Sequence, residues 1–357
     1  MSIWQTLVKL RRRPAYRALL AGGLSWVFGT ATADTPALGT QDGGHLSETT
    51  FADYSPLSTA AEITRRLMSP LSQREAAQDA KNAHRTLEGQ PVDLAKERFL
   101  VYLPKTEPAP GQAYGLLIFV PPWPKAQIPA EWLPALDRYH LIMASAEQSG
   151  NEVSPFNRRV PLALLALENL RAQFPIDPNR TFVGGFSGGS RIALRLLMGY
   201  PDQFRGALLN AGSDAVGEKD LPLPPGDLLQ KVQESSRLVY LTGERDEPHL
   251  IDDMNSRSSL KRWCIFDVVT LNEPRRDHEP ADAVTFTQAL EALLRPPATS
   301  RELNSCQDRL RQRLSEDTDR VAALFARGDK HAAGALQALD AKYGGLAAPR
   351  SLELASH

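Results

Sequence analysis

A serine stands in the middle of a glycine-rich segment, Gly185-Phe186-Ser187-Gly188-Gly189. An apolar run typical of a strand, 181–186, precedes it, and a run with helical period, 189–199, follows it. A sharp strand-to-helix turn that exposes a serine needs small residues two positions to either side, and both are glycine here. The pattern predicts an exposed Ser187 hydroxyl, with the Gly188 N–H and the start of the helix facing the negative charge that develops on a substrate oxygen.

A phosphate-binding loop is the other structure that a glycine-rich turn between a strand and a helix suggests. Such a loop needs Lys-Ser or Lys-Thr after the glycines, and a dinucleotide site needs Gly-x-Gly-x-x-Gly. Neither pattern is present at 181–191. The segment therefore favours a serine nucleophile over a nucleotide site.

A serine nucleophile needs a base, and the base needs an acid that orients it. Asp246 lies in the loop after the strand-like run 238–242 and is the predicted acid. The alternatives are Glu244, Glu247 and Asp252 nearby and Asp214 after the preceding strand.

The predicted base is His278, because it alone among seven histidines lies just after the last predicted strand and just before a helix. That position is at the carboxyl edge of the sheet, where ligands bind in open α/β folds. His249 also follows the serine, but it stands at the start of a helix directly after the acid loop, and we interpret it as structural.

The segments that must position these side chains begin near residue 97. Short apolar runs rich in Val, Ile, Phe and Tyr alternate there with segments of helical period. The alternation predicts an α/β fold with a doubly wound, mostly parallel sheet over 97–296. The predicted strands are 99–103, 114–120, 140–144, 181–186, 206–210, 238–242 and 265–270. The predicted helices between them are 160–172, 189–199, 227–234, 249–261 and 282–294.

The order serine, acid, histidine along such a chain resembles the α/β-hydrolases. Among them the chain is similar to secreted esterases of the polyhydroxyalkanoate depolymerase and feruloyl esterase kind, through 185–189, 243–246 and Asp277-His278-Glu279-Pro280. The resemblance covers 97–296. It implies a serine hydrolase that cleaves a carboxylic ester, in a small or polymeric substrate, with no metal or organic cofactor.

The chain departs from those esterases at the second donor of the oxyanion hole. They usually carry His-Gly after the third strand, whereas Val120 here runs into Pro121-Pro122-Trp123-Pro124, and proline has no N–H. Trp123 is thus the only backbone donor in the turn, and we expect its N–H to act with that of Gly188. Its indole either packs on the loop or lines the substrate site. Gln148 and Asn151, in the loop after the next strand, are further candidates for substrate contact.

The segments that flank the hydrolase-like unit have a different character. Residues 1–33 carry five basic residues and no acidic one, then an apolar stretch and Ala31-Thr32-Ala33, and this predicts a signal peptide. A retained membrane anchor or a chance apolar helix is the alternative. Residues 34–96 form a polar N-terminal extension with predicted helices at 59–68 and 73–87. Residues 297–357 form a tail, with amphipathic helix predicted over 301–339.

Composition and charge narrow the class of protein. The 357 residues, 42% of them hydrophobic and 23% charged, are those of a folded protein, and a mean hydropathy of −0.32 excludes a polytopic membrane protein. Beyond residue 33 the chain has 36 basic and 42 acidic residues, so nothing indicates a nucleic-acid partner. If the protein is exported to the periplasm or secreted, Cys264 and Cys306 either pair or remain buried thiols.

Two other functions fit the same residues. A serine peptidase or amidase uses the same three side chains and differs only in its substrate site and leaving group. A secreted binding protein that has lost catalysis is the second, because the His-Gly turn is missing and the charged tail offers a surface for a protein partner. Retention of Ser187, Asp246 and His278 together favours the hydrolase.

Overall fold

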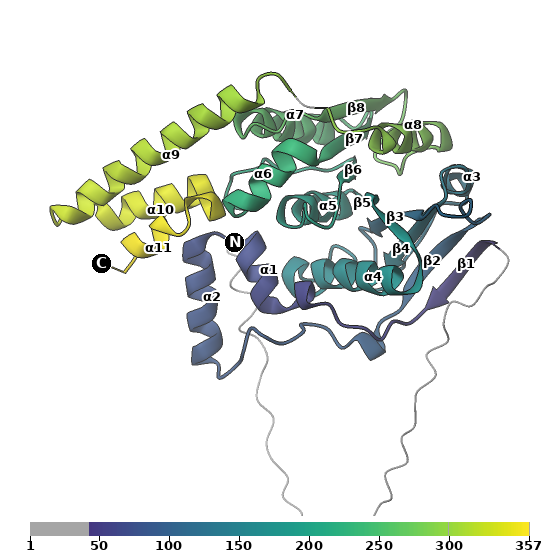
Figure 1. The fold of residues 1–357 in the computed structure, drawn as a ribbon, viewed down its shortest axis with the longest axis horizontal. Helices are drawn as coiled ribbons and strands as arrows, with labels where there is room; N and C mark the ends of the chain where they lie inside the picture. Colours follow the sequence, from purple (N-terminus) through teal and green to yellow (C-terminus); the bar gives the residue numbers. More distant parts are fainter. Residues whose placement is uncertain (1–42, 299, 357) are drawn as a thin grey trace, which may run out of the picture. The chain divides into compact units, whose positions relative to one another are not determined.

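The computed structural model describes residues 43–298 and 300–356, and the predicted signal peptide at 1–33 lies outside them. One eight-stranded sheet runs in the order β1-β2-β4-β3-β5-β6-β7-β8 (Figure 1). The strands are β1 (Gly43–Thr49), β2 (Phe99–Lys105), β3 (Tyr114–Val120), β4 (Leu141–Ala146), β5 (Ile176–Phe186), β6 (Gly206–Asn210), β7 (Arg237–Gly243) and β8 (Val268–Glu273). Strand β2 is antiparallel to both β1 and β4, and every other pair is parallel. The predicted mostly parallel α/β sheet is therefore confirmed.

The central strands read as unbroken apolar runs because helices cover both of their faces. Strands β4, β6 and β7 are buried along their whole length, as parallel strands in such folds are. Two hydrophobic cores result, one on each side of the sheet, and they stabilise the arrangement by removing apolar surface from water. The sheet is thus a rigid base for the loops at its carboxyl edge.

Helices form a layer on each face of the sheet (Figure 1). One core includes residues of α4, α5 and α6, and the other includes residues of α3 and α8. The helices are α1 (Ala60–Leu67), α2 (Pro70–Asn82), α3 (Leu133–Arg138), α4 (Val160–Gln173), α5 (Gly188–Gly199), α6 (Gly226–Ser235), α7 (Glu247–Arg262), α8 (Ala283–Leu294), α9 (Leu303–Ala326), α10 (Ala332–Tyr343) and α11 (Arg350–Leu354). Short 3-10 turns lie at Pro56–Ser58, Leu94–Lys96, Ala130–Trp132 and Gly344–Ala347, and a π-helical turn at Pro155–Arg159 precedes α4. No helix within 43–298 and 300–356 has both the length and the apolar character that crossing a membrane requires.

Three strands differ from the sequence-based prediction by more than two residues, and the first of them is β5, which begins at Ile176, five residues earlier than predicted. The sequence of β1, GGHLSET, has no apolar alternation, and its pairing with β2 from Gly43 to Thr49 makes it part of the sheet. Strand β8 begins at Val268, three residues later than predicted. The reason is that the Ile265 N–H still donates to the Leu260 carbonyl at the end of α7, and pairing with β7 starts only at Val268.

The two flanking segments pack against the same side of the molecule. The carboxylate of Asp340, in α10, accepts from the Ser69 hydroxyl and from the Leu71 N–H at the start of α2. A disulfide joins Cys264, after α7, to Cys306, in α9. The amphipathic tail forms two helices instead of one, because the chain turns at Gly328, and α10 lies alongside α9 (Figure 1).

Candidate active site

Ser187 occupies the tight turn between β5 and α5. Its backbone has φ of 54° and ψ of −124°, a region that non-glycine residues rarely adopt and that costs about 1–3 kcal/mol. The turn is held by its neighbours: the Ser187 N–H donates to the Asn210 carbonyl at 2.8 Å, and the Ser187 carbonyl accepts from the Ser190 N–H at 3.0 Å. A strained residue fixed in this way holds its side chain at the carboxyl edge of the sheet.

The glycines two residues away from Ser187 are required by close backbone contacts. A Cβ atom at Gly189 would collide with the Val120 carbonyl at the end of β3, and one at Gly185 would collide with the backbone of Gly189. The first turn of α5 can therefore approach β3 and β5 only because both positions lack a side chain. The glycine pattern seen in the sequence has this packing as its physical cause.

The structure brings Ser187, His278 and Asp246 together. The His278 Nε2 atom lies 3.0 Å from the Ser187 Oγ, and the His278 Nδ1 atom lies 2.7 Å from the Asp246 Oδ2. Asp246 caps α7 directly after β7, and His278 lies in the loop between β8 and α8. The backbones of these two loops are bonded, because the Arg245 N–H donates to the Arg276 carbonyl at 2.9 Å.

The environment of Asp246 keeps it ionised. Burial raises the pKa of the Asp246 carboxyl, but hydrogen bonds from His249 and His278 lower it by more, and the net pKa lies below its usual value. Three of the four alternative acids have other partners: Asp214 pairs with Arg191 and Arg195, and Asp252 pairs with Arg191. Glu244 accepts from the Arg275 N–H.

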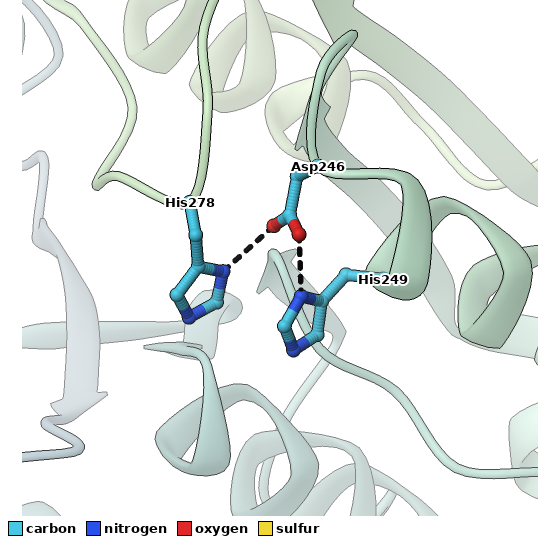
Figure 2. A group of neighbouring side chains, drawn as sticks. All are labelled: Asp246, His249 and His278. Atoms are coloured by element: carbon cyan, nitrogen blue, oxygen red, sulfur yellow. Dashed lines mark hydrogen bonds and ion pairs between the residues drawn. The ribbon is translucent and has the colours of Figure 1, made fainter.

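His249 is the residue of this site that the sequence analysis interprets as structural. Its Nδ1 atom lies 2.7 Å from the Asp246 Oδ1, so the carboxylate faces two imidazoles (Figure 2). The two rings stack, with centroids 4.2 Å apart and planes 14° apart. A signal was available, because Pro248 marks a helix start and places residues 246 and 249 one turn apart.

The side chains of Asp246, His249 and His278 lie close enough together to hold a metal ion, with one ligand atom from each within 4.8 Å of the others. Both imidazole Nδ1 atoms, however, already face carboxylate oxygens at hydrogen-bond distance. Hydrogen bonding of two histidines to one acid accounts for the whole arrangement, and no metal is needed to explain it.

Two loops border the turn at Ser187. The Asn151 N–H donates to the Pro122 carbonyl at 2.9 Å, and the Gln148 N–H donates to the Pro124 carbonyl at 2.6 Å. Buried Arg159 crosses behind them and donates to the carbonyls of Ser149 and Pro121. The loop after β3 and the loop after β4 therefore act as one unit.

The predicted substrate residues have different positions in these loops. The side-chain amide of Asn151 lies against Gly188, where it occupies the space that a Cβ would fill. The Trp123 ring lies 5.7 Å from that of Phe186, which lies 4.8 Å from the His278 ring. The Gln148 side chain is exposed. Its backbone carbonyl accepts a hydrogen bond from the Arg158 side chain and so helps to hold the loop.

Two backbone donors, one in the turn at Ser187 and one in the loop after β3, have no acceptor among the described residues. Among the hydrogen bonds of residues 43–298 and 300–356, neither the Gly188 N–H nor the Trp123 N–H is a donor. These are the two groups that the sequence predicts for an oxyanion hole. An N–H group can bind an oxyanion only if it has no other acceptor, and both groups meet that condition among the described residues.

The sheet order, the turn at Ser187 and the strands that carry Asp246 and His278 define the α/β-hydrolase fold. No protein-family model matches the sequence, and no curated protein matches it either.

Solved structures are similar to part of the chain. A thermostable esterase aligns with a TM-score of 0.42 and 16% identity over 57% of this chain and 60% of its own. A dipeptidyl peptidase 4 from Porphyromonas gingivalis aligns at 0.41 and 13% identity, over 55% of this chain and 33% of its own. An S-formylglutathione hydrolase from Staphylococcus aureus aligns at 0.42 and 14% identity, over 55% of this chain and 91% of its own. This chain thus spans about a third of the peptidase.

Proposed function

We propose that this protein is a serine hydrolase that cleaves a carboxylic ester, with Ser187 as nucleophile, His278 as base and Asp246 as the orienting acid. The observation that carries the proposal is the unbroken pair of contacts from Ser187 Oγ to His278 Nε2 and from His278 Nδ1 to Asp246, at a serine held in a strained turn. Structural serines rarely have such surroundings.

In the first step the Ser187 oxygen attacks the ester carbonyl, and its proton passes to the Nε2 atom of His278. Asp246 accepts the Nδ1 hydrogen and stabilises the imidazolium that forms. The Gly188 and Trp123 N–H groups hold the oxyanion. His278 then gives its proton to the leaving alcohol, and a water molecule, activated by the same histidine, hydrolyses the acyl-enzyme.

An ester is proposed over an amide because the residues resemble those of secreted esterases, and a small or polymeric ester fits equally. Asn151 and the indole of Trp123 are the proposed substrate contacts beside the nucleophile. Gln148 is a weaker candidate, since its exposed side chain takes part in no hydrogen bond among the described residues. We also propose that the protein is exported, in keeping with the Cys264–Cys306 disulfide, which persists in an oxidising compartment.

The test is fluorophosphonate labelling of the purified protein, located by mass spectrometry, beside turnover of nitrophenyl acyl esters and of matched nitroanilides. We expect label on Ser187 and ester turnover. In Ser187→Ala both should vanish, because the nucleophile is gone. Ser258→Ala, at an exposed position of α7, is the matched control and should keep both.

The other functions predict different results. Turnover of the nitroanilides, with no turnover of the nitrophenyl esters, would show that the protein is a peptidase or amidase and not an esterase. No label and no turnover, together with a protein partner whose capture needs residues 301–339, would replace catalysis by binding.

A further inference from the structure

Both oxygens of the Asp246 carboxylate face a histidine. Oδ2 lies 2.7 Å from Nδ1 of His278, and Oδ1 lies 2.7 Å from Nδ1 of His249 (Figure 2). Asp246 is 5% exposed, so water contributes little to its solvation. The orientation of the carboxylate is therefore set by two imidazoles from different elements.

The place of His249 is fixed by the first turns of α7. Asp253, one turn further along, is 2% exposed and accepts from the hydroxyls of Ser213 and Thr242, each at 2.6 Å. Arg191, from α5, pairs with Asp252 at 2.7 Å. Helix α7 is thus tied to β7, to the loop after β6 and to α5, and His249 cannot be treated as a freely moving surface side chain.

We propose that His249 is a positioning residue that shares the carboxylate of Asp246 with His278 and so sets the orientation of His278. The inference rests on the proposed hydrolase function. A neutral His249 donates its Nδ1 hydrogen to Oδ1, which keeps Oδ2 directed at His278 and leaves the His249 ring stacked on the ring of the base.

His249 takes no proton in the reaction. During acylation the Ser187 proton moves to Nε2 of His278 while the bond from Ser187 Oγ to the carbonyl carbon forms, and the carbonyl electron pair moves to the oxyanion. His249 acts on this step through Asp246, by holding the acceptor of the Nδ1 hydrogen in line.

The charged and titratable groups around His249 come from several elements. They are Asp246 at the cap of α7, Asp253 in the next turn, His278 from the loop before α8, and Arg191 from α5, which is paired with Asp252. Of these groups, the Asp246 carboxylate is the one to which His249 is hydrogen-bonded.

The experiment compares His249→Leu, which has no donor, with His249→Gln, whose side-chain amide can still donate to Oδ1. Turnover of a nitrophenyl ester is measured from pH 5 to pH 10, with thermal unfolding of each variant. We expect His249→Leu to lose about tenfold in kcat at the plateau with KM within about twofold, because the acceptor of the His278 Nδ1 hydrogen is no longer held in line. His249→Gln should recover most of the kcat. His45→Leu, at an exposed position on β1, is the matched control and should behave as the unmodified protein.

A His249→Leu protein with unchanged kcat would overturn the inference. A variant that unfolds at a lower temperature, but keeps the original kcat in its folded fraction, would also overturn it, since that result assigns a structural role alone. Failure of the proposed function is a distinct result, because then the unmodified protein itself shows neither turnover nor fluorophosphonate label.

Discussion

A single carboxylate organises the residues of the site. Asp246 accepts hydrogen bonds from two histidines, and one of them contacts Ser187. Because these bonds lower the pKa of Asp246, the group favours the folded state above the ordinary carboxyl pKa, near 4. The contribution is lost as the pH falls through the lower, folded-state pKa. At neutral pH the acid is therefore always available as an anion.

Replacing Asp246 by asparagine should lower kcat by about 10⁴-fold, the loss measured for the same change in a serine protease triad. The amide nitrogen cannot accept the Nδ1 hydrogen, so His278 is left in the wrong tautomer to act as base. Ester turnover and the rate of fluorophosphonate labelling measure the effect. Glu244→Gln, in the same loop, is the control and should stay within about twofold.

The Asp246→Asn result also bears on the choice of acid. A loss of less than about tenfold would mean that another carboxylate orients His278. Asp214 and Asp252, the predicted alternatives, would then be tested in turn, although both are engaged by Arg191.

The sequence predicts Ser187, Asp246 and His278 because each follows a strand, and the carboxyl ends of parallel strands share one edge. The spacing of His249 from Asp246, one helical turn, is visible in the sequence, but the stacking of its ring on that of His278, 29 positions away, is not. Nor could the sequence predict the contact of Asn151 with Gly188, which arises from the joint packing of two loops. Chain order thus specifies the elements of a site, and packing specifies the partners.

At the scale of elements, the candidate active site depends on how closely α5 approaches the sheet. The Val120 carbonyl, at the end of β3, lies where a Cβ of residue 189 would be. Any side chain there must push the helix away from β3 and so move the turn that holds Ser187.

Gly189→Ala should therefore destabilise the protein by about 2–3 kcal/mol, the upper part of the range for overpacking, and should abolish ester turnover. Thermal unfolding and nitrophenyl ester kinetics measure the two effects. The matched control is Gly334→Ala in α10, where no atom lies within 4 Å of the added Cβ. Alanine has the higher helix propensity, so this variant should gain up to about 1 kcal/mol and keep its activity. Equal stability of the two variants would contradict the packing argument.

Some elements leave a clear pattern in the sequence, whereas others form only through contacts with distant parts of the chain. Strands β3, β6 and β7 are found where their apolar runs indicate them, because burial on both faces leaves a strong pattern. Strand β1 has no such pattern, and its position follows from backbone pairing with β2. Helix α3 (Leu133–Arg138) is too short for a period to be recognised.

At the scale of the whole molecule, the segments before and after the unit at 97–296 pack against that unit and against each other. Arg66, in α1, pairs with Asp202 after α5, and Arg74, in α2, donates to the Ala355 carbonyl in the tail. The side chain of Tyr343, at the end of α10, is buried, and its ring lies 6.0 Å from that of Trp263. The tail is thus an integral part of the packed structure, held by apolar burial as well as by the disulfide.

Removal of the disulfide separates these two contributions. The bond closes a loop with a sequence separation of 42 residues, which stabilises the folded state by about 4 kcal/mol on the chain-entropy account. The double variant Cys264→Ser with Cys306→Ser should therefore unfold roughly 5–10 °C lower. Ester turnover should stay within about twofold, because the apolar contacts of α9 and α10 still hold the tail and no residue of the site moves. A reductant should lower the unfolding temperature of the unmodified protein by a similar amount and leave that of the double variant unchanged. If reductant has no effect on the unmodified protein, the bond does not contribute to its stability; if turnover collapses with the disulfide, the tail supports the active site directly.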